Sequence, residues 1–455
     1  MAPKFGTSGL RGLVTELTAD LVADHLRAFA ATCPMGTGLW VGRDLRASSP
    51  DLAAVVIAAG RSMGLCVTDC GAVPTPALAL AAMGAGAASV MVTGSHIPAD
   101  RNGLKFYTPT GEITKADEAA ILGALGRPSP NLPSPPVATC PTAGADWVAR
   151  YVTAFGARAL AGLRVGVWAH SAVSRDLLAK ALQDMGAQAV SLGRSETFVP
   201  VDTEAVSPVA RADLAAWAPG LDAIISTDGD GDRPLLADGA GRVIPGDILG
   251  QITAARLGAE TVVTPVSSNT GAEASGRFGR VLRTKIGSPF VIAAMQAAGG
   301  RVVGYEANGG FLLGFEATGP VGPLPALMTR DSLLPLVTVL QAARQAGGLA
   351  ALMAAEPARF TAADRLEETP PEVTGPLLAA LTADPAPLLS PLSETEAARD
   401  TTDGLRLTLA SGRILHLRPS GNAPEFRIYA EAETAEAAAR LLEQARDRLS
   451  ARIAG

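Results

Sequence analysis

Residues 223–233 read AIISTDGDGDR, a short apolar run that passes at once into an acidic loop containing glycine. A short apolar run that is followed at once by a polar loop containing glycine recurs at 89–96 (SVMVTGSH) and at 301–310 (RVVGYEANGG). Segments 174–185 and 291–298 are typical of helices and lie between such runs, so we expect β-α alternation in mostly parallel sheets. In sheets of that kind ligands bind beyond the carboxyl ends of the strands. The three loops are therefore the first candidates for a functional site.

The length and the proline pattern predict several domains. A chain of 455 residues favours about three domains, with four small ones allowed. The proline-rich stretch 126–141 is the clearest linker, and a second proline-marked stretch at 356–371 precedes the last domain. After it, strands are expected at 405–409, 413–417 and 425–430, followed by a helix with one apolar face. This tail is expected to be an α+β module.

Charge and composition exclude several classes of protein. The net charge is −6, only 4% of the residues are aromatic and no long basic run occurs, which argues against a nucleic-acid partner. The longest apolar stretch, 77–92, is shorter than the ~20 residues that span a bilayer, so no membrane role is expected. The four cysteines form no C-x-x-C pair, and the opening MAPKFGTSGLRG lacks the basic flank and apolar core of a signal peptide. We therefore expect a cytoplasmic protein. Any anionic ligand should be held by a few arginine, lysine and backbone N–H groups that converge on it.

The acidic loop predicts a metal site. Asp228, Asp230 and Asp232 alternate with glycines, so that three hard oxygen ligands can converge on one divalent cation such as Mg²⁺. Three close carboxylates repel one another, and this repulsion requires a cation or a basic partner. An EF-hand is excluded because its sixth position would be Arg233 and its twelfth would be Gly239. A plain solvated acidic turn stays open as the alternative.

The loop that contains Ser95, here called the serine loop, offers a hydroxyl group that could carry a phosphate bound to such a cation. A phosphoryl oxygen is the usual partner of Mg²⁺ held by carboxylates, and Ser95 follows an expected strand on a tight turn. The G-x-S-x-G elbow of hydrolases is absent, because Thr93 and Ile97 stand where it needs glycine. His96 orients Ser95 or satisfies its own loop. Lys105 returns an ammonium group to the site or is simply solvated.

Two further loops have the composition of phosphate sites. Residues 418–427 (RPSGNAPEFR) combine an arginine fork, a hydroxyl, a glycine backbone and an amide, as in a phosphate cradle. Hairpin chemistry at Gly421-Asn422 explains part of this loop as well. Residues 6–12 (GTSGLRG) form a second such loop, which is not a Walker A sequence because the G-K-[ST] ending is absent.

Five segments, taken in order, resemble the motif series of a known superfamily. FGTSGLRG, TGSHIPADRNGLKF, DGDGDR, GYEANGG and RPSGNAPEFRIY are similar to those of the α-D-phosphohexomutases, most closely the bacterial phosphomannomutase/phosphoglucomutase branch. The resemblance covers residues 5–429. It implies an α/β fold of three related mixed-sheet α/β domains and a fourth, TBP-like α+β domain around a central cleft. On this chain the four domains would span 1–135, 142–245, 246–358 and 359–455.

The resemblance also implies an activity. Members of the family move phosphate between C6 and C1 of a hexose, through a phosphoserine enzyme and a hexose 1,6-bisphosphate that also acts as activator. Mg²⁺ is the implied cofactor, hexose phosphates are the implied substrates, and a monomer or a dimer is compatible with the sequence. The family's roles fall on these residues: catalysis, Ser95, Lys105, Arg11 and His96; metal binding, Ser95, Asp228, Asp230 and Asp232; substrate binding, Glu306, Asn308, Lys285 and Arg233; binding of the phosphate that is not transferred, Arg418, Ser420, Gly421, Asn422 and Arg427. Arginine is a poor base, so we expect Lys105 to move the proton and Arg11 to act by its charge.

Several positions depart from the family pattern. The usual A-S-H-N-P is here GSHIP at 94–98, Asn308 replaces a serine of the sugar loop, and Ser288 stands where many relatives have histidine. We expect phosphoryl transfer to survive these changes and the sugar preference to depend on them. Phosphomannomutase is favoured because GTSGLRG and RPSGNAPE resemble that group more than phosphoglucosamine mutase, whose first loop usually has Asp at the position of Ser8. The alternatives are phosphoglucomutase, phosphoglucosamine mutase, a metal-dependent sugar-phosphate phosphatase and a non-catalytic sugar-phosphate-binding protein.

Overall fold

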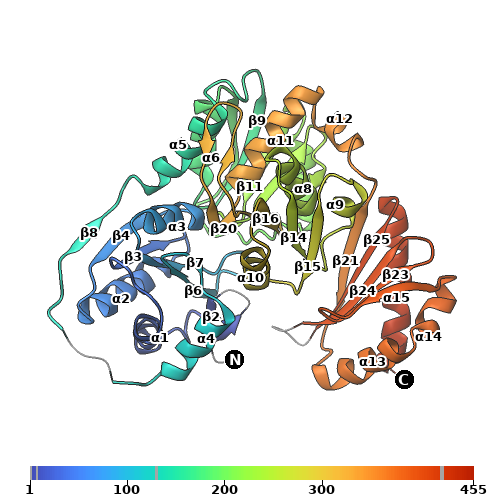
Figure 1. Cartoon of the computed structure of the whole chain (residues 1–455), viewed down its shortest axis with the longest axis horizontal. Coiled ribbons are helices and arrows are strands. Elements are labelled where there is room, and N and C mark those ends of the chain that lie inside the picture. Colours follow the sequence, from blue (N-terminus) through green and yellow to red (C-terminus); the bar gives the residue numbers. More distant parts are fainter. Residues whose placement is uncertain (1–2, 7–8, 129–131, 421–424, 455) are drawn as a thin grey trace. The chain divides into compact units, whose positions relative to one another are not determined.

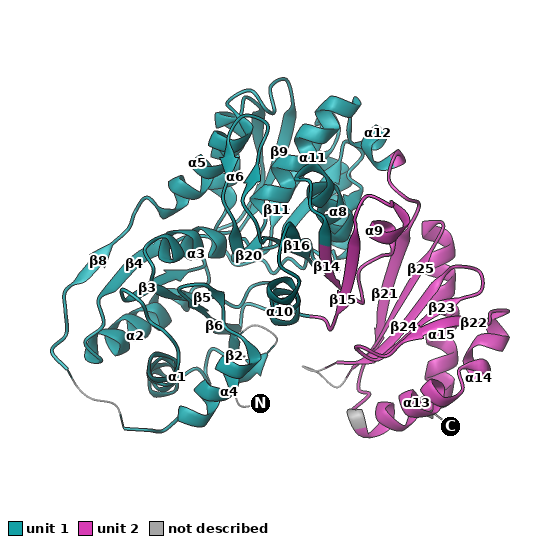
Figure 2. Cartoon of the chain, viewed as in Figure 1, with its two compact units in different colours: residues 1–261, 287–353 teal, residues 262–286, 354–455 magenta. Residues whose placement is uncertain are grey.

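The chain forms two units in the computed structural model, which describes residues 3–6, 9–128, 132–420 and 425–454 (Figure 1). Unit 1 comprises residues 1–261 and 287–353, and unit 2 comprises residues 262–286 and 354–455 (Figure 2). Helices alternate with the strands of mixed sheets, which confirms the α/β class predicted from the sequence. The four domain boundaries given above remain a prediction. Among the described residues, no helix is both long and apolar enough to cross a membrane.

The first sheet of unit 1 contains β1 (Lys4–Gly6), β2 (Gly9–Leu13), β3 (Leu39–Arg43), β4 (Val67–Ala72), β5 (Ala88–Val92), β6 (Arg101–Thr108), β7 (Gly111–Glu112) and β8 (Val137–Thr139). The strand order is β1-β2-β6-β5-β3-β4-β8, and β7 pairs with β6. β5 is buried along its whole length, as expected of a central strand that is covered on both faces. β8 belongs to the proline-rich stretch 126–141 and takes an edge position, where proline is tolerated.

Helices of the same region are α1 (Ala19–Thr32), α2 (Ser49–Ser62), α3 (Thr75–Gly84) and α4 (Lys115–Ala124). α1 begins after Thr18, whose side chain accepts a hydrogen bond from the Leu21 N–H and so caps the helix. The helix buries Val22, Leu26 and Phe29, which recur at helical spacing and join the core under the sheet. The amphipathic pattern of this segment therefore sets both its conformation and its packing.

The second sheet contains β9 (Arg164–His170), β10 (Gln188–Arg194), β11 (Ala223–Thr227), β12 (Pro234–Asp238) and β13 (Val243–Ile244), in the order β10-β9-β11-β12-β13. β9 is parallel to both β10 and β11, whereas β11 and β12 are antiparallel. The helices of this part are α5 (Ala143–Phe155), α6 (Arg175–Asp184) and α7 (Pro208–Trp217). The helix expected at 174–185 is confirmed as α6.

The last part of unit 1 contains β16 (Val302–Tyr305), β17 (Phe311–Leu313) and β20 (Leu327–Asp331), which are neighbours in one antiparallel ladder. A small ribbon is formed by β18 (Ala317–Thr318) and β19 (Pro323–Leu324). The helices are α8 (Gly246–Arg256), α10 (Ser288–Ala298), α11 (Leu333–Ala346) and α12 (Leu349–Ala354). α10 confirms the helix expected at 291–298.

Each of the three loops found in the sequence connects two antiparallel strands. The serine loop joins β5 to β6, and the acidic loop joins β11 to β12. The loop at 306–310, here called the sugar loop after its counterpart in the family that the sequence resembles, joins β16 to β17. The expectation of mostly parallel sheets was wrong, because a second strand follows each loop, antiparallel to the first; the sheets are mixed, as the family resemblance implied. A paired strand on either side holds each loop at both of its ends.

Unit 2 contains most of β14 (Thr261–Pro265), together with β15 (Arg280–Thr284), β21 (Phe360–Leu366), β22 (Glu396–Asp400), β23 (Leu405–Leu409), β24 (Ile414–Pro419) and β25 (Phe426–Ala432). Its helices are α9 (Gly271–Ala274), α13 (Pro371–Ala383), α14 (Ala386–Leu389) and α15 (Ala435–Ala454). The antiparallel sheet runs in the order β21-β25-β24-β23-β22, and α15 packs against β21 and β25.

The core of unit 2 follows from two periodic patterns. Along β23, Leu405, Leu407 and Leu409 are buried and the residues between them are not, as expected of a strand with one covered face. On α15, Leu441 and Leu449 lie on one face and join the same core. The α+β tail predicted from the sequence is thereby confirmed.

Candidate active site

Ser95 lies in the loop between β5 and β6, in a backbone conformation that serine rarely adopts. Its φ is 53°, in the left-handed region, and its side chain is fully buried. The Ser95 N–H donates to Thr93 Oγ1 at 2.7 Å, and the Thr93 hydroxyl donates to Asp44 Oδ2 at 2.7 Å. Such a conformation persists only where the surrounding contacts impose it, and it is common in functional loops.

The acidic loop brings three carboxylates together. Asp228, Asp230 and Asp232 are fully buried, and each offers an oxygen within 4.8 Å of the others. Gly231 turns the loop with a φ of 78°, a conformation that glycine adopts without steric cost. The alternating glycines of the sequence therefore allow the three side chains to face one point.

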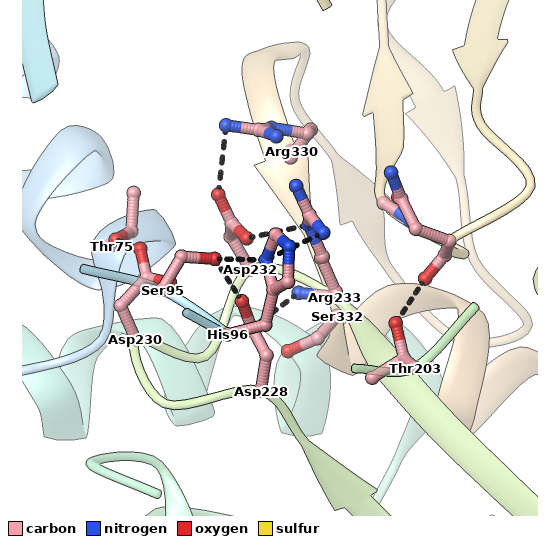
Figure 3. Close-up of polar contacts among 12 residues, drawn as sticks. Thr75, Ser95, His96, Thr203, Asp228, Asp230, Asp232, Arg233, Arg330 and Ser332 are labelled. Atoms are coloured by element: carbon pink, nitrogen blue, oxygen red, sulfur yellow. Dashed lines mark hydrogen bonds and ion pairs between the residues drawn. The ribbon is translucent and has the colours of Figure 1, made fainter. Parts of the chain in front are cut away.

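The serine loop and the acidic loop are in direct contact (Figure 3). Ser95 Oγ donates a hydrogen bond to Asp228 Oδ2 at 2.5 Å, across 133 positions of sequence. Thr75, at the start of α3, donates through Oγ1 to Asp230 Oδ2 at 2.5 Å. The hydroxyl and the carboxylate cluster, whose proximity the predicted chemistry requires, thus lie side by side.

The residues of this cluster fit a divalent cation. Asp230 Oδ1 and Asp232 Oδ1 are buried and accept no hydrogen bond from any residue that the structure describes. Burying unpaired carboxylate oxygens is costly, and a cation would satisfy them. Carboxylate oxygens are the hard ligands that Mg²⁺ takes in proteins. Asp228, Asp230 and Asp232 could therefore hold Mg²⁺ beside the Ser95 hydroxyl.

Lys105, on β6, brings a positive charge to the same carboxylates. Its buried Nζ lies 2.6 Å from Asp230 Oδ2 and 2.7 Å from Asp232 Oδ2. Burial acts to raise the pKa of Asp230, but the Lys105 ammonium outweighs it and holds that pKa below its usual value. Burial, together with repulsion from the other two aspartates, raises the pKa of Asp228 well above its usual value. The ammonium offsets part of the repulsion within the triad.

His96 lies between Ser95 and Arg233. Its Nδ1 is 3.3 Å from Ser95 Oγ and accepts a hydrogen bond of 2.9 Å from Arg233 Nη1. Burial, and then the charges of Arg233 and Arg11, lower the pKa of His96 well below its usual value, so the imidazole is neutral at pH 7. Burial also lowers the pKa of Arg11, on β2, to about 10, which leaves the guanidinium charged at neutral pH. Arg11 can therefore act by charge.

Arg330, at the end of β20, is a buried charged residue that the sequence analysis missed. Its Nη2 lies 3.0 Å from Asp232 Oδ2, its Nε 3.4 Å from Glu112 Oε1, and its Nη1 3.8 Å from Glu306 Oε2. Ser288, where relatives often have histidine, donates to Glu112 Oε2 at 2.6 Å. Arg330 thus connects the acidic loop with the glutamate of the sugar loop. A lone arginine within a strand carries no spacing signal that would have revealed this.

The sugar loop is held by its own asparagine. Asn308 Oδ1 accepts a hydrogen bond of 3.0 Å from the Gly310 N–H, and the Asn308 carbonyl accepts one of 2.8 Å from Thr203 Oγ1. Glu306 is buried in the same loop. Burial raises the pKa of Glu306, and the Arg330 guanidinium acts against that rise. The loop therefore presents a buried carboxyl group on a fixed backbone.

The remaining predicted residues belong to unit 2. Arg418 Nε lies 3.4 Å from Asp403 Oδ1, and Asp403 Oδ2 accepts a hydrogen bond of 3.0 Å from the Ile286 N–H. Asp403, which the sequence analysis also missed, therefore contacts both Arg418 and the backbone next to Lys285. Ser420 follows β24 and its N–H donates to the Glu425 carbonyl at 2.8 Å, while Arg427 on β25 pairs with the Glu425 carboxylate at 3.5 Å. Gly421 and Asn422 lie outside the described residues.

Family models match most of the chain. The models of the alpha/beta/alpha domains I, II and III of phosphoglucomutase/phosphomannomutase match residues 2–129, 147–241 and 245–360, and the model of the C-terminal domain matches residues 377–448. The four matches follow the chain order of the domains.

Individual relatives match over nearly their full length. A phosphomannomutase of Sinorhizobium fredii is 45% identical, with 98% of each chain covered. A phosphomannomutase of Salmonella muenchen is 41% identical, with 96% of this chain and 94% of the relative covered. The crystal structure of a phosphoglucomutase/phosphomannomutase family protein from Burkholderia thailandensis has a TM-score of 0.77 at 21% identity, and covers 98% of this chain and 96% of that one. This last similarity concerns the fold.

Proposed function

The chain belongs to the phosphoglucomutase/phosphomannomutase family and is a hexose-phosphate mutase, and we propose that it interconverts mannose 6-phosphate and mannose 1-phosphate. Membership of the family confirms the resemblance found in the sequence. The choice of mannose is supported by the names of the two relatives with 45% and 41% identity, which are both phosphomannomutases. The residue roles that follow are parts of the same proposal.

The contact of Ser95 with Asp228 is the observation that carries the proposal. A phosphoryl carrier needs an oxygen next to groups that offset the charge of the group it carries. Ser95 Oγ lies 2.5 Å from the Asp228 carboxylate, and the adjacent Asp230 and Asp232 carboxylates are 2.6 and 2.7 Å from Lys105 Nζ. We therefore assign Ser95 as the residue that carries phosphate.

The transfer step exchanges one phosphorus–oxygen bond for another. As a hydroxyl oxygen of the sugar bonds to phosphorus, the bond from phosphorus to Ser95 Oγ breaks and Ser95 Oγ keeps the electron pair. Lys105 relays the proton: its ammonium group gives a proton to Ser95 Oγ and takes the proton of the sugar hydroxyl in its place. The second phosphate of the resulting bisphosphate then returns a phosphoryl group to Ser95 by the reverse step. Arg11 and Arg233 offset the charge of the phosphoryl group, and His96, which is neutral, orients Ser95 Oγ.

Asp228, Asp230 and Asp232, with an oxygen on Ser95, are the groups that would hold Mg²⁺. Bound there, the cation would neutralise the carboxylates and offset the charge of the phosphoryl group. Glu306 and Asn308 are the proposed partners of the sugar hydroxyls. Hexose 1,6-bisphosphate as activator and a cytoplasmic location complete the proposal.

Unit 2 is proposed to hold the phosphate that is not transferred. Arg418 is kept in place by Asp403, which also binds the backbone next to Lys285. An oriented guanidinium and an ammonium group can bind a phosphate without taking part in its chemistry. Such binding holds the sugar for either half of the reaction.

Conversion of mannose 1-phosphate to mannose 6-phosphate, with MgCl₂ and a trace of hexose 1,6-bisphosphate, tests the function. We expect Ser95→Ala to lower kcat on the order of 10⁴-fold or more, because a nucleophile cannot be replaced by its neighbours. Ser89→Ala is the matched control, since Ser89 is a buried serine of β5 just before the loop. Full activity of Ser95→Ala would show that phosphate is carried elsewhere.

Two further measurements test the reaction class and the sugar. Release of inorganic phosphate in proportion to turnover would show a phosphatase, and a mutase releases only traces. Comparison of kcat/KM for mannose 1-phosphate, glucose 1-phosphate and glucosamine 1-phosphate tests the sugar. A higher value for either of the other two sugars would refute the preference for mannose and leave the mutase mechanism intact.

A further inference from the structure

Arg46, in the segment between β3 and α2, binds four backbone carbonyls of the serine loop. Its Nη1 donates to the carbonyls of Pro98 and Arg101 at 2.7 and 2.8 Å, and its Nη2 donates to those of Ser95 and Ile97 at 2.9 and 2.6 Å. The side chain is only 2% exposed. One guanidinium group thus binds the backbone of the serine loop at four positions between Ser95 and Arg101.

A second set of contacts joins Arg46 to the other side of the loop. Arg46 Nε lies 3.2 Å from Asp44 Oδ2, and Asp44 Oδ2 accepts the hydrogen bond of the Thr93 hydroxyl. Thr93 Oγ1 in turn accepts from the Ser95 N–H. Ser49 Oγ donates to Asp44 Oδ1 at 2.5 Å and fixes that carboxylate. The backbone of Ser95 is therefore held at its carbonyl by Arg46 directly and at its N–H through Thr93 and Asp44.

The same guanidinium group also lies over Phe198, an aromatic residue that is packed close to the acidic loop. Its central carbon lies 3.8 Å from the centre of the Phe198 ring, within the range of a cation–π contact. A Cβ atom on Gly229 would lie 2.8 Å from the Ser95 carbonyl oxygen and 2.9 Å from the Phe198 ring. Gly229 of the acidic loop is therefore packed between the carbonyl that Arg46 binds and the ring that Arg46 covers.

These contacts explain how Ser95 keeps its left-handed conformation. Serine at a φ of 53° is strained, and the strain persists only where other contacts fix the backbone on both sides. The guanidinium group is rigid and planar, with donors in a fixed fork, so it fixes the directions of the four carbonyls as well as their distances. A lysine at this position keeps the charge but offers no such fork.

We propose that Arg46 is a positioning residue for phosphoryl transfer. It fixes the Ser95 backbone and thereby the position of Ser95 Oγ relative to the Asp228 carboxylate. It acts through Ser95, Thr93 and Gly229. The proposal rests on the proposed role of Ser95 and adds a residue outside the family motifs quoted above. The proposal requires that loss of the Arg46 contacts with the serine loop slows the chemical step more than it weakens substrate binding.

Arg283 of unit 2 provides a matched control. Like Arg46 it is largely buried and donates to several backbone carbonyls, here those of Pro265, Ser268 and Asn269, and it pairs with the Glu273 carboxylate at 2.7 Å. Arg283→Lys therefore removes the same kind of fork from a loop that has no part in the proposed chemistry. The two lysine variants separate a general loss of backbone support from a loss at the serine loop.

The experiment compares Arg46→Lys, Arg283→Lys and the unaltered protein in the mutase assay at saturating MgCl₂. We expect Arg46→Lys to lower kcat about 10- to 100-fold with KM changed less than about twofold, since small misplacement of a reacting group has that effect. Arg283→Lys should keep kcat within about twofold. Equal kcat for the two variants, or a loss that appears only in KM, would overturn the proposal.

Hydrogen exchange provides a readout that does not depend on activity. Amide exchange in peptides covering 93–103 should become faster in Arg46→Lys and stay unchanged in Arg283→Lys. Phe198→Leu, which removes the ring face but leaves the four carbonyls bound, should produce a smaller increase. If Ser95→Ala keeps its activity, the proposed function fails whatever the exchange shows. If Ser95→Ala is inactive but exchange and kcat of Arg46→Lys are unchanged, only the role of Arg46 fails.

Discussion

The Lys105 ammonium and the Asp230 carboxylate form a buried ion pair with an Nζ–Oδ2 distance of 2.6 Å. A buried pair repays the cost of removing two charges from water only if its geometry is good and its other polar atoms are satisfied. Here Asp230 Oδ2 also accepts from Thr75, while Asp230 Oδ1 is left without a hydrogen bond among the described residues. The pair therefore leaves one carboxylate oxygen available to a further cation.

Lys105 and a divalent cation compete for the same carboxylates, so Lys105→Met should bind Mg²⁺ more tightly. Removal of a positive charge next to Asp230 and Asp232 strengthens the attraction of both for a second cation. We expect the Kd for Mg²⁺ to fall by about tenfold or more, the equivalent of about 1.4 kcal/mol. Isothermal titration with MgCl₂ in the absence of sugar measures it.

Lys115→Met is the control for Lys105→Met, because Lys115 is exposed and pairs with its helical neighbour Glu118 at 2.6 Å. Its affinity for Mg²⁺ should equal that of the unaltered protein. Weaker binding by Lys105→Met would mean that the lysine supports the metal site instead of competing for it.

Arg330→Met should destabilise unit 1, because it leaves three buried carboxylates without their shared cation. Asp232, Glu112 and Glu306 all lie within 3.8 Å of the Arg330 guanidinium. Breaking a buried ion pair by removal of one partner costs about 3–5 kcal/mol of unfolding free energy. Thermal and urea denaturation at pH 7 measure the loss.

The charge argument for Arg330 has its own test. Glu112→Gln in the Arg330→Met background should recover part of the lost stability, since one uncompensated carboxylate disappears. Arg344→Met is the control, as Arg344 is exposed and donates to the Ala161 carbonyl, with no carboxylate partner among the described residues. A similar loss of stability in Arg330→Met and Arg344→Met would contradict the role given to Arg330.

Asp403→Asn should weaken substrate binding and leave the chemical step nearly unchanged. The amide oxygen can still accept from the Ile286 N–H, but the charge that orients Arg418 is lost. A residue that holds the phosphate equally well before and during transfer affects KM and not kcat. We expect KM to rise about tenfold, the equivalent of about 1.4 kcal/mol of substrate binding, because the ion pair that orients Arg418 is lost.

Steady-state kinetics with mannose 1-phosphate measure the effect of Asp403→Asn. Asp384→Asn is a suitable control in the same unit, because Asp384 is exposed and accepts a hydrogen bond from the Ala386 N–H, which the asparagine oxygen can also accept. A fall in kcat at constant KM would place Asp403 in the transfer step and not in phosphate binding.

The parts of the site that lie in local motifs could be predicted from the sequence. Asp228, Asp230 and Asp232 are separated by single glycines, and Ser95 lies in the loop that begins where a fully buried strand ends. Spacing of this kind determines which way the side chains face, so the chemistry could be inferred before the fold. The strand that follows each loop was missed. A polar loop with glycine can precede either a helix or a strand, and the sequence of the loop does not distinguish the two.

Contacts made through the fold could not be predicted. Arg330 meets Asp232 and Glu112 only because β20, the acidic loop and β7 come together in space, and no spacing along the chain records this. The same holds for Asp403, whose carboxylate joins two segments of unit 2. The role of such a buried charged residue can be recognised only when the structure shows which residues it contacts.

The stability of the protein should fall as pH decreases below neutrality, and His416 should account for part of this fall. His416 is buried, stacks on the Tyr429 ring and holds the Asp403 carbonyl through Nε2. Burial lowers the pKa of His416 from 6.5 to about 4. The unfolded chain therefore binds a proton between these two values that the folded chain does not, so unfolding is favoured as pH falls from 6.5 towards 4. At pH 5 the shift corresponds to about 2 kcal/mol.

A comparison of His416→Gln with the unaltered protein isolates this contribution. Glutamine can still donate to the Asp403 carbonyl but does not titrate, so the variant should lose less stability between pH 7 and pH 5, by about 2 kcal/mol. His96 and His170, whose pKa values are also lowered by burial, are present in both proteins, and their contributions cancel in the difference. Denaturant titrations at the two pH values measure it. An equal loss in both proteins would mean that His416 titrates alike in the folded and unfolded chain, in conflict with its burial.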